Sequence, residues 1–274
     1  MAWTRRYEDA EPQRVNRWLA QMGVCSRREA EGLIADGLVA IDGETVADVG
    51  RKILPGQTLT LADRAEAGLA GQLTVVLHKP VGIVSAHPEP GQTPAARLLS
   101  QETLVGEAPY IPGAETSLPP LGRLDLDSRG LLLLSEDGVL AKAVIGPESE
   151  LDKEYLVRVH GQVTEAKVRQ LRFGLRLDGR QLRRARVDQL GPQKLRFVLK
   201  EGRNRQIRRM CELVGLTVTD LFRVRIGPLK LGDLPEGRWR ALTAEERAAL
   251  LEASKPSPPA GEGGLRSRSG QGSR

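Results

Sequence analysis

Two aspartates, Asp125 and Asp127, stand in a polar stretch at 122–130 that leads directly into four consecutive leucines at 131–134. The leucine run predicts a buried strand. A carboxylate held beside such a rigid element can act as a nucleophile or as a general base. Asp127 suits a turn cap better than Asp125 does. A glycosidase pair is disfavoured, because those two carboxylates flank the bond from separate elements at about 5–9 Å.

A second candidate is the arginine-rich segment KEGRNRQIRRMCELVG at 200–215. Asn204 is predicted to cap a helix that starts near Arg205. Apolar side chains then recur at helical spacing on one face and arginines on the other: Ile207, Met210, Cys211 and Val214 against Arg205, Arg208 and Arg209. We expect the arginine face at the edge of a cleft, where it would bind phosphate and pair with an aspartate.

Strand-like composition marks three further runs, at 72–78, 154–159 and 194–199. No glycine-rich dinucleotide or phosphate-loop motif accompanies them, and the three histidines have no partners at metal-ligand spacing. The sequence therefore gives no support to a dinucleotide or phosphate-loop site and disfavours a metal site. The two cysteines, Cys25 and Cys211, are far apart in the chain, which excludes a disulfide framework.

The charge balance indicates a polyanionic partner. The 274 residues include 41 Lys and Arg against 35 Asp and Glu, a formal charge of +6, and the pI is about 9.6. Such an excess favours nucleic acid. Phe, Trp and Tyr number three each, so binding through phosphates and shape is expected rather than a broad stacking platform. No apolar run reaches the roughly 20 residues that span a bilayer, so we expect no membrane association.

Changes in composition divide the chain into five parts. Residues 1–11 are predicted to be a flexible N-terminus, 12–62 a compact basic module, and 63–71 a linker. Residues 72–252 form a long mixed segment that carries the candidate chemistry. The tail at 253–274 is rich in Ser, Pro, Gly and Arg, and is predicted to be disordered.

The basic module has a clear local pattern. Helical spacing over 15–22 predicts one helix, and Ser26 opens a second with Glu29 completing a capping box. A hairpin is expected at the Asp-Gly pair at 42–43, and another strand at 58–61. Arginines cluster around the two helices, where they can hold phosphates.

This module, with RVNRWLAQMGVCSRREAEGLIADGLVAIDG at its heart, resembles the S4 RNA-binding domain over about residues 14–61. The resemblance implies a helical pair packed on a small sheet, with a basic face that docks structured RNA. The arginines expected to make that contact are Arg14, Arg17, Arg27 and Arg28.

Four motifs in the larger segment together resemble the pseudouridine synthase family: HKPVG at 78–82, GRLDLDSRGLLLLSEDG at 122–138, KEYLV at 153–157 and EGRNRQIRRMCE at 201–212. With the S4-like module in front, the similarity is to the branch that modifies ribosomal RNA, most of all to its F-type members, which act on large-subunit RNA. It implies an α+β fold: a mixed, mainly antiparallel sheet with flanking helices, preceded by a small ααβ RNA-binding module.

The resemblance also assigns roles. It makes Asp125 the catalytic aspartate, Tyr155 the ring that stacks on the target uracil, and Arg208 the basic residue that pairs with the aspartate. It gives Arg123 the task of holding the strand whose base is turned outward. Lys79 and Pro80 would be architectural. Further RNA contacts are expected from the arginines around the second motif: Arg203, Arg205 and Arg209.

The activity implied is isomerisation of one uridine in large-subunit ribosomal RNA, a reaction that needs no cofactor. We expect a cytoplasmic protein, and a monomer because the sequence carries no oligomerisation signal. The residues leave several alternatives open: a transfer RNA anticodon, a small-subunit uridine, an assembling ribosomal particle as substrate, or an RNA-binding assembly factor without catalysis. Which uridine is modified, and whether the aspartate acts as nucleophile or base, also stay open.

Overall fold

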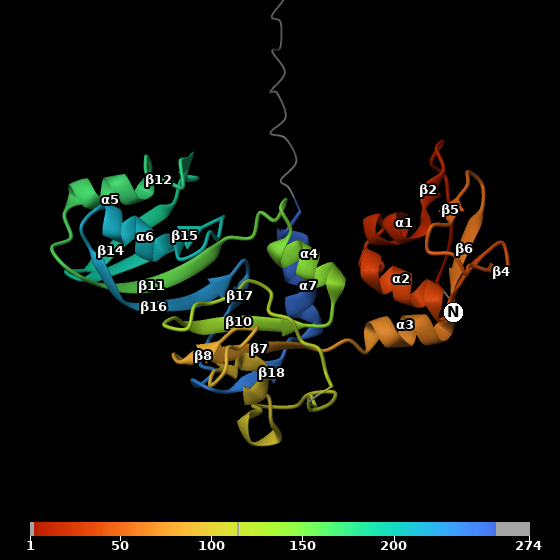
Figure 1. Cartoon of the computed structure of the whole chain (residues 1–274), viewed down its shortest axis with the longest axis horizontal. Coiled ribbons are helices and arrows are strands. Elements are labelled where there is room, and N and C mark those ends of the chain that lie inside the picture. Colours follow the sequence, from red (N-terminus) through yellow and green to blue (C-terminus); the bar gives the residue numbers. More distant parts are fainter. Residues whose placement is uncertain (1–2, 114, 256–274) are drawn as a thin grey trace, which may run out of the picture.

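A computed structural model describes residues 3–113 and 115–255 (Figure 1). Its N-terminal part is a small module built on a four-stranded sheet in the order β1-β6-β3-β4. The strands are β1 (Thr4–Arg6), β6 (Thr58–Leu61), β3 (Val39–Ile41) and β4 (Glu44–Thr45); a second pair joins β2 (Gln13–Arg14) to β5 (Lys52–Ile53). Two helices, α1 (Val15–Gln21) and α2 (Arg27–Ala35), pack on this framework around a shared apolar core.

Local sequence signals explain the small module. The Ser26 hydroxyl accepts the Glu29 N–H at 3.2 Å, and the Glu29 carboxylate accepts the Ser26 N–H, so the predicted capping box opens α2. Asp42 and Gly43 both have positive φ, 51° and 86°, which is the backbone of the predicted hairpin turn between β3 and β4.

Two predicted boundaries need correction. The first residues were expected to be flexible, but β1 pairs with β6 and Tyr7 is only 1% exposed. The segment at 63–71, expected to be a linker, forms helix α3 (Asp63–Ala70), whose Ala65 is buried in the module's core. Both were missed because an exposed edge strand and a short solvated helix carry few apolar residues. The tail predicted to be disordered lies, from residue 256 onward, outside the described residues.

The larger part is built on an eight-stranded sheet in the order β14-β15-β11-β16-β10-β7-β18, with β17 paired to β16. The strands are β14 (Arg186–Gly191), β15 (Lys194–Leu199), β11 (Lys153–His160), β16 (Thr217–Ile226), β10 (Arg129–Ser135), β7 (Thr74–Lys79), β18 (Trp239–Ala241) and β17 (Leu229–Lys230). All neighbours are antiparallel except β10 and β16, which confirms the expected mixed, mainly antiparallel fold.

Helices cover the sheet in two groups. At one end lie α5 (Glu165–Arg172) and α6 (Gln206–Leu213), and nearer the small module lie α4 (Gly138–Ile145) and α7 (Ala244–Ala253) (Figure 1). Shorter elements lie in the connections. Between β7 and β10 are β8 (Ile83–Val84), β9 (Thr93–Pro94) and the 3₁₀ turns at 95–98 and 101–103, and between α5 and β14 are β12 (Arg176–Leu177) and β13 (Arg180–Gln181).

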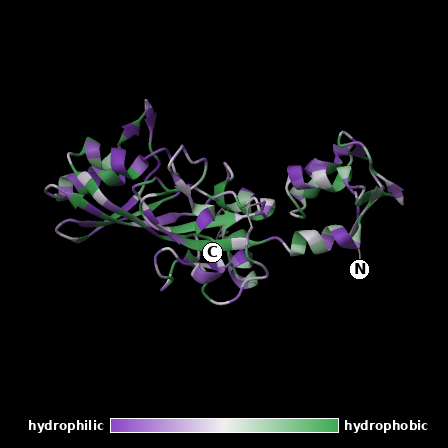
Figure 2. Cartoon of the chain, turned by 60° about the horizontal axis from the view of Figure 1, so that its bottom comes forward, coloured by the Kyte–Doolittle hydropathy of each residue, from purple (hydrophilic) through white to green (hydrophobic). Residues whose placement is uncertain are grey.

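The predicted strand runs are β7, β11 and β15, and the leucine run is β10. Its four leucines are at most 1% exposed, and the apolar colouring in Figure 2 follows the central strands of this sheet. Both cysteines are free and buried, and burial raises the pKa of the Cys25 and Cys211 thiols to about 12. Along the described residues, no helix has the length and apolar character needed to cross a bilayer.

The Glu29 carboxylate joins the two parts of the chain. Glu29, in the first turn of α2, accepts the N–H of Gly138, the first residue of α4, at 3.1 Å, and also a bond from the Gln72 amide. The fit is close at Gly138, because a Cβ there would lie 2.5 Å from the Ser26 hydroxyl. Glu29 therefore contacts the N-termini of two helices, one from each part.

Candidate active site

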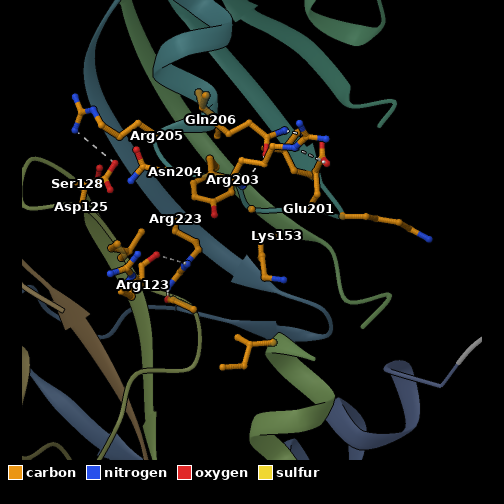
Figure 3. Close-up of a pocket in the computed structure, with 18 of the residues that line it drawn as sticks. Arg123, Asp125, Ser128, Lys153, Glu201, Arg203, Asn204, Arg205, Gln206 and Arg223 are labelled. Atoms are coloured by element: carbon orange, nitrogen blue, oxygen red, sulfur yellow. Dashed lines mark hydrogen bonds and ion pairs between the residues drawn. The ribbon is translucent and has the colours of Figure 1, made fainter. Parts of the chain in front are cut away.

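A cavity of about 430 Å³ opens over β11 and β16. Asp125, which Figure 3 shows, and Tyr155 both line it. The rest of the lining includes residues 122–124, the end of α4 with the residues just after it, and the segment at 199–207 that joins β15 to α6. This volume lies within the range of about 300–1,000 Å³ that is typical of ligand sites. The cavity thus brings together residues that lie far apart in the sequence.

Arg223 fixes the loop that carries Asp125. This arginine lies on β16 and is 1% exposed, which is unusual for a charged side chain. Its Nε donates to the Leu131 carbonyl at 2.7 Å and its Nη2 to the Gly122 carbonyl at 2.9 Å. Gly130 lets β10 approach β16 closely, since a Cβ there would lie 2.2 Å from the main-chain oxygen of Arg223. The loop is therefore tied to the sheet just before the aspartate.

Ser85 fixes the residue next to Asp125. Its buried hydroxyl donates to the Leu124 carbonyl at 2.7 Å and accepts the Leu124 N–H at 2.9 Å. Ser85 is in turn placed by Lys79, whose ammonium donates to the carbonyls of Pro80 and Ile83 at 2.8 and 2.6 Å. Lys79 is fully buried, and burial lowers its pKa to about 8. These contacts agree with an architectural role for Lys79 and extend that role to Ser85.

The arginine nearest to Asp125 is not the one expected. Arg205 Nη1 lies 3.6 Å from the Asp125 carboxylate, and the same guanidinium bonds both Asp127 oxygens at 3.1–3.2 Å. Arg208 is 7% exposed and shares no ion pair with Asp125 among the residues that the structure describes.

The buried guanidinium of Arg208 bonds instead to residues that come after Asp125 in the chain. It donates to the Asp127 carbonyl at 2.7 Å, the Ser128 hydroxyl and the Val218 carbonyl, and it forms an ion pair with the Asp127 carboxylate. Partial burial favours the neutral form of Asp127, but Arg205 and Arg208 together outweigh this and lower its pKa. Asp127 is therefore a structural carboxylate that holds two arginines in place.

The start of α6 explains the difference. The helix begins at Gln206, and its cap residue is Arg205 in a left-handed conformation with φ 48°, so Asn204 is not the cap that was predicted. The Gln206 side chain accepts the Arg203 N–H at 2.9 Å instead. The apolar face formed by Ile207, Met210, Cys211 and Val214 is buried as predicted. Arg208, expected on the exposed face, is buried against the sheet.

Tyr155 occupies a fixed position in the wall of the cavity. It lies on β11 opposite Phe197 and Arg223, next to a bulge between Glu154 and Tyr155. Its side chain packs against two apolar cores, one under α5 and α6 and the other around Trp239. A supported aromatic ring that borders a cavity is suited to stacking on a flat heterocycle.

The cavity wall is strongly cationic. Among the residues that the structure describes, two carboxylates line it, Asp125 and Glu201, against seven basic side chains: Arg123, Lys153, Arg183, Lys200, Arg203, Arg205 and Arg223. Burial and the nearby Arg223 lower the pKa of Lys153. No three His, Cys, Asp or Glu side chains within residues 3–113 and 115–255 are placed to hold a metal ion. The wall suits an anionic ligand such as a polynucleotide.

Most of the arginines predicted to bind RNA are exposed. Arg14, Arg17, Arg27 and Arg28 lie on the surface of the small module, and none forms an ion pair with another described residue. Arg123, Arg203 and Arg205 line the cavity, whereas Arg209 does not and pairs with Asp178 instead.

Comparison with known proteins matches residues 73–213 to the RNA pseudouridylate synthase family and residues 13–59 to the S4 domain. A dual-specificity RNA pseudouridine synthase RluF from Salmonella typhi is 35% identical over 87% of this chain and 78% of the relative. The chain belongs to the RNA pseudouridylate synthase family.

Other relatives agree with this assignment. The RluF enzyme of Escherichia coli K12 is 34% identical over the same shares of both chains. A crystal structure of a pseudouridylate synthase matches with a TM-score of 0.59 and 25% identity, over 86% of this chain and 99% of that one. The protein is thus an RNA pseudouridine synthase, an isomerase whose partner is RNA.

Reasoning from sequence missed Arg223 and Ser85, which fix the Asp125 loop, and three basic residues of the cavity wall, Lys153, Arg183 and Lys200. A charged residue at an inward position of the strand-like run at 217–226 was an available signal for Arg223. Nothing in the sequence marks Ser85, because its role depends on two loops that meet only in the folded chain.

Proposed function

We propose that this synthase isomerises a specific uridine in large-subunit ribosomal RNA, with Asp125 as the catalytic carboxylate and the target base flipped into the cavity. The observation that carries the proposal is that Asp125 and Tyr155 line one cationic cavity. The relatives named dual-specificity RNA pseudouridine synthase support an RNA target of this kind. We expect the protein to act as a monomer in the cytoplasm.

The chemistry requires one carboxylate. The bond between N1 and C1′ of the uridine breaks, the uracil turns, and C5 bonds to C1′. C5 then loses its proton and N1 gains one, so the formula is unchanged. Asp125 acts either as a nucleophile or as the base that takes a sugar proton. Arg205, 3.6 Å from this carboxylate, orients it and contributes positive charge beside it.

The target base must leave its stack to reach Asp125, which costs a few kcal/mol. Tyr155 offsets part of that cost by stacking on the uracil, since its ring is already held between two apolar cores. Arg123 is an exposed residue of the cavity lining with no ion pair to another described residue, and it holds the backbone of the flipped nucleotide. The four exposed arginines of the small module hold RNA outside the cavity.

The decisive experiment compares the wild type with Asp125→Asn on protein-free transcripts of large-subunit ribosomal RNA. We expect pseudouridine at one position with the wild type, none with the variant, and equal affinity of both for the transcript. Pseudouridine formation by the variant at the wild-type rate refutes the role of Asp125. Parallel reactions with small-subunit and transfer RNA show whether either is the true substrate. A wild type that binds every RNA and modifies none identifies an assembly factor.

A further inference from the structure

A basic hairpin, defined here as residues 173–184, stands beside the cavity. It contains β12, the turn at Asp178 and Gly179, and β13, followed by two consecutive arginines. Its single acidic residue is Asp178, against four exposed arginines: Arg176, Arg180, Arg183 and Arg184. This density of positive charge was not part of the expected RNA-binding set.

The positive charge of the basic hairpin is largely unbalanced. Asp178 is engaged by Arg209 of α6, through bonds of 2.6 and 3.0 Å, so it does not pair with the hairpin's own arginines. Arg183 is 3.8 Å from Glu150, a long and exposed pairing. Arg180 and Arg184 form no ion pair with any described residue. The outer surface is therefore free to attract phosphate.

The basic hairpin is rigidly attached to the rim of the cavity. Arg203 donates to the Leu177 carbonyl at 3.3 Å and to the Gln181 carbonyl at 3.1 Å, so it spans both strands. The Arg183 N–H donates to the Glu201 carboxylate at 3.0 Å. Arg203 and Arg209, which we expected to bind RNA, instead act as struts that hold the hairpin. A ligand would meet a surface that is already ordered, at a low entropic cost.

An aromatic residue adds a second kind of contact. Phe173 is 48% exposed, and the Arg184 guanidinium lies over its ring at 4.2 Å from the centroid. Exposed rings and guanidinium planes are the groups on which unpaired bases stack. Phe173 and Arg184 together form a flat, cationic platform at the base of the basic hairpin.

The location suits a strand that passes through the active site. Arg183 lines the same cavity as Asp125. The lining of that cavity also includes the end of α4, whose first residue, Gly138, contacts the small module through Glu29. Figure 1 shows β12 and the small module on opposite sides of α4. The cavity thus lies between two basic surfaces.

We propose that the basic hairpin is a second RNA-contact surface, which holds the nucleotides that flank the target uridine on the side away from the S4 module. Arg180 and Arg184 bind phosphates, and the platform of Phe173 and Arg184 stacks on an unpaired base. The inference rests on the proposed function and identifies a further surface with which the same site binds its RNA substrate.

The test is the double variant Arg180→Ala/Arg184→Ala, assayed for binding to protein-free large-subunit ribosomal RNA transcripts across a salt series. The slope of log K against log salt is negative, and each lost phosphate contact reduces its magnitude by roughly 0.7–0.9. We therefore expect the magnitude of the slope to fall by about 1.5 and binding at low salt to be about tenfold weaker. The matched control is Arg97→Ala/Lys230→Ala, which removes two exposed charges away from the cavity and should bind like the wild type.

A second variant, Phe173→Leu, removes the ring and keeps apolar volume. We expect weaker binding with an unchanged salt slope, because no charge is lost. If the double variant keeps the wild-type affinity and salt slope, the inference is overturned. The same result is expected if the hairpin binds a protein instead of RNA. Circular dichroism and thermal unfolding of each variant exclude misfolding as the cause. Pseudouridine formation by the wild type is measured in parallel, and its absence refutes the proposed function without affecting the binding result.

Discussion

At the scale of single residues, the backbone of Arg205 stands out, because a left-handed conformation costs a non-glycine residue on the order of 1–3 kcal/mol. That conformation directs the guanidinium towards Asp125 and Asp127. Arg208, three residues later on a regular helix, points instead into the sheet. Two arginines of one motif thus have different tasks, one beside the reactive carboxylate and one beneath its loop.

Substitution separates these two tasks. We expect Arg205→Ala to lower the single-turnover rate at least tenfold with little effect on the free energy of unfolding. Arg208→Ala should lower the unfolding free energy by about 3 kcal/mol, because it leaves the buried acceptors of the loop unpaired. Urea unfolding and single-turnover assays measure the two effects. An unchanged urea midpoint in Arg208→Ala would contradict the structural role.

Lys79 makes stability depend on pH. Its pKa is about 8 in the folded chain against 10.5 for the unfolded one, so the unfolded state binds more protons between these values and stability rises with pH there. Compared with Lys79→Met, the wild type should gain up to about 3 kcal/mol between pH 8 and pH 10.5. Chemical unfolding at pH 7, 9 and 10 checks this, and a constant difference would contradict it.

The residue types of the site were predictable, but one partnership was not. Asp125 and Tyr155 share a cavity, as the motifs led us to expect. The partner of Asp125 depends on the conformation of the residue before α6, and neither spacing nor residue type reveals that conformation. Helical periodicity placed Arg208 on the exposed face, whereas the open space under the loop at 127–128 accepts its side chain.

At the scale of elements, the active-site loop is positioned largely by its neighbours. The segment at 80–85 is held by Lys79, and it holds Leu124 through the Ser85 hydroxyl. On the other side, β16 holds Gly122 through Arg223. Asp125 therefore follows a short segment, residues 122–124, that is held from two sides, which keeps the carboxylate at one place in the cavity.

Loss of one clamp should affect the reaction more than binding. We expect Ser85→Ala to reduce kcat by about tenfold with KM nearly unchanged, since a small misplacement of a catalytic group is costly. Ser85→Thr retains the hydroxyl and should restore most of the rate. Steady-state kinetics of both variants, on the transcript that the wild type modifies, measure these changes in kcat and KM. Equal losses in the alanine and threonine variants would indicate a packing defect and contradict the positioning role.

Elements with strong local signals were predicted well. The capping box of α2, the turn at 42–43 and the leucine strand each carry a physical signature that survives in the fold. Strand β1 and helix α3 were missed, because β1 exposes all three of its side chains and gains its place only from pairing with β6. Such tertiary pairings lie beyond the reach of periodicity.

At the scale of the whole molecule, Glu29 is a polar contact that joins the two parts. Partial burial favours its neutral form, but bonds from Ser26, Gln72 and Gly138 outweigh this and lower its pKa. A carboxyl whose pKa is lowered by folding stabilises the fold above its unfolded value near 4.5, and this contribution is lost as the pH falls through the folded value.

We therefore expect Glu29→Gln to unfold at a lower urea concentration than the wild type at pH 7, and the difference to shrink at pH 4 and below. Arg28, the exposed residue next to Glu29, provides a control. No bond joins its side chain to α4 among the described residues, so Arg28→Ala should keep the wild-type midpoint. A difference between the glutamine variant and the wild type that stays constant with pH would contradict an ionised contact.

The buried thiols of Cys25 and Cys211 have a practical consequence. With pKa values raised to about 12, neither forms the reactive thiolate near neutral pH. A dye attached through maleimide chemistry would therefore go only to cysteines added at the surface, such as Asp36→Cys on one module and Gln181→Cys on the basic hairpin. Energy transfer between two such dyes would follow in real time whether the enzyme closes around its substrate.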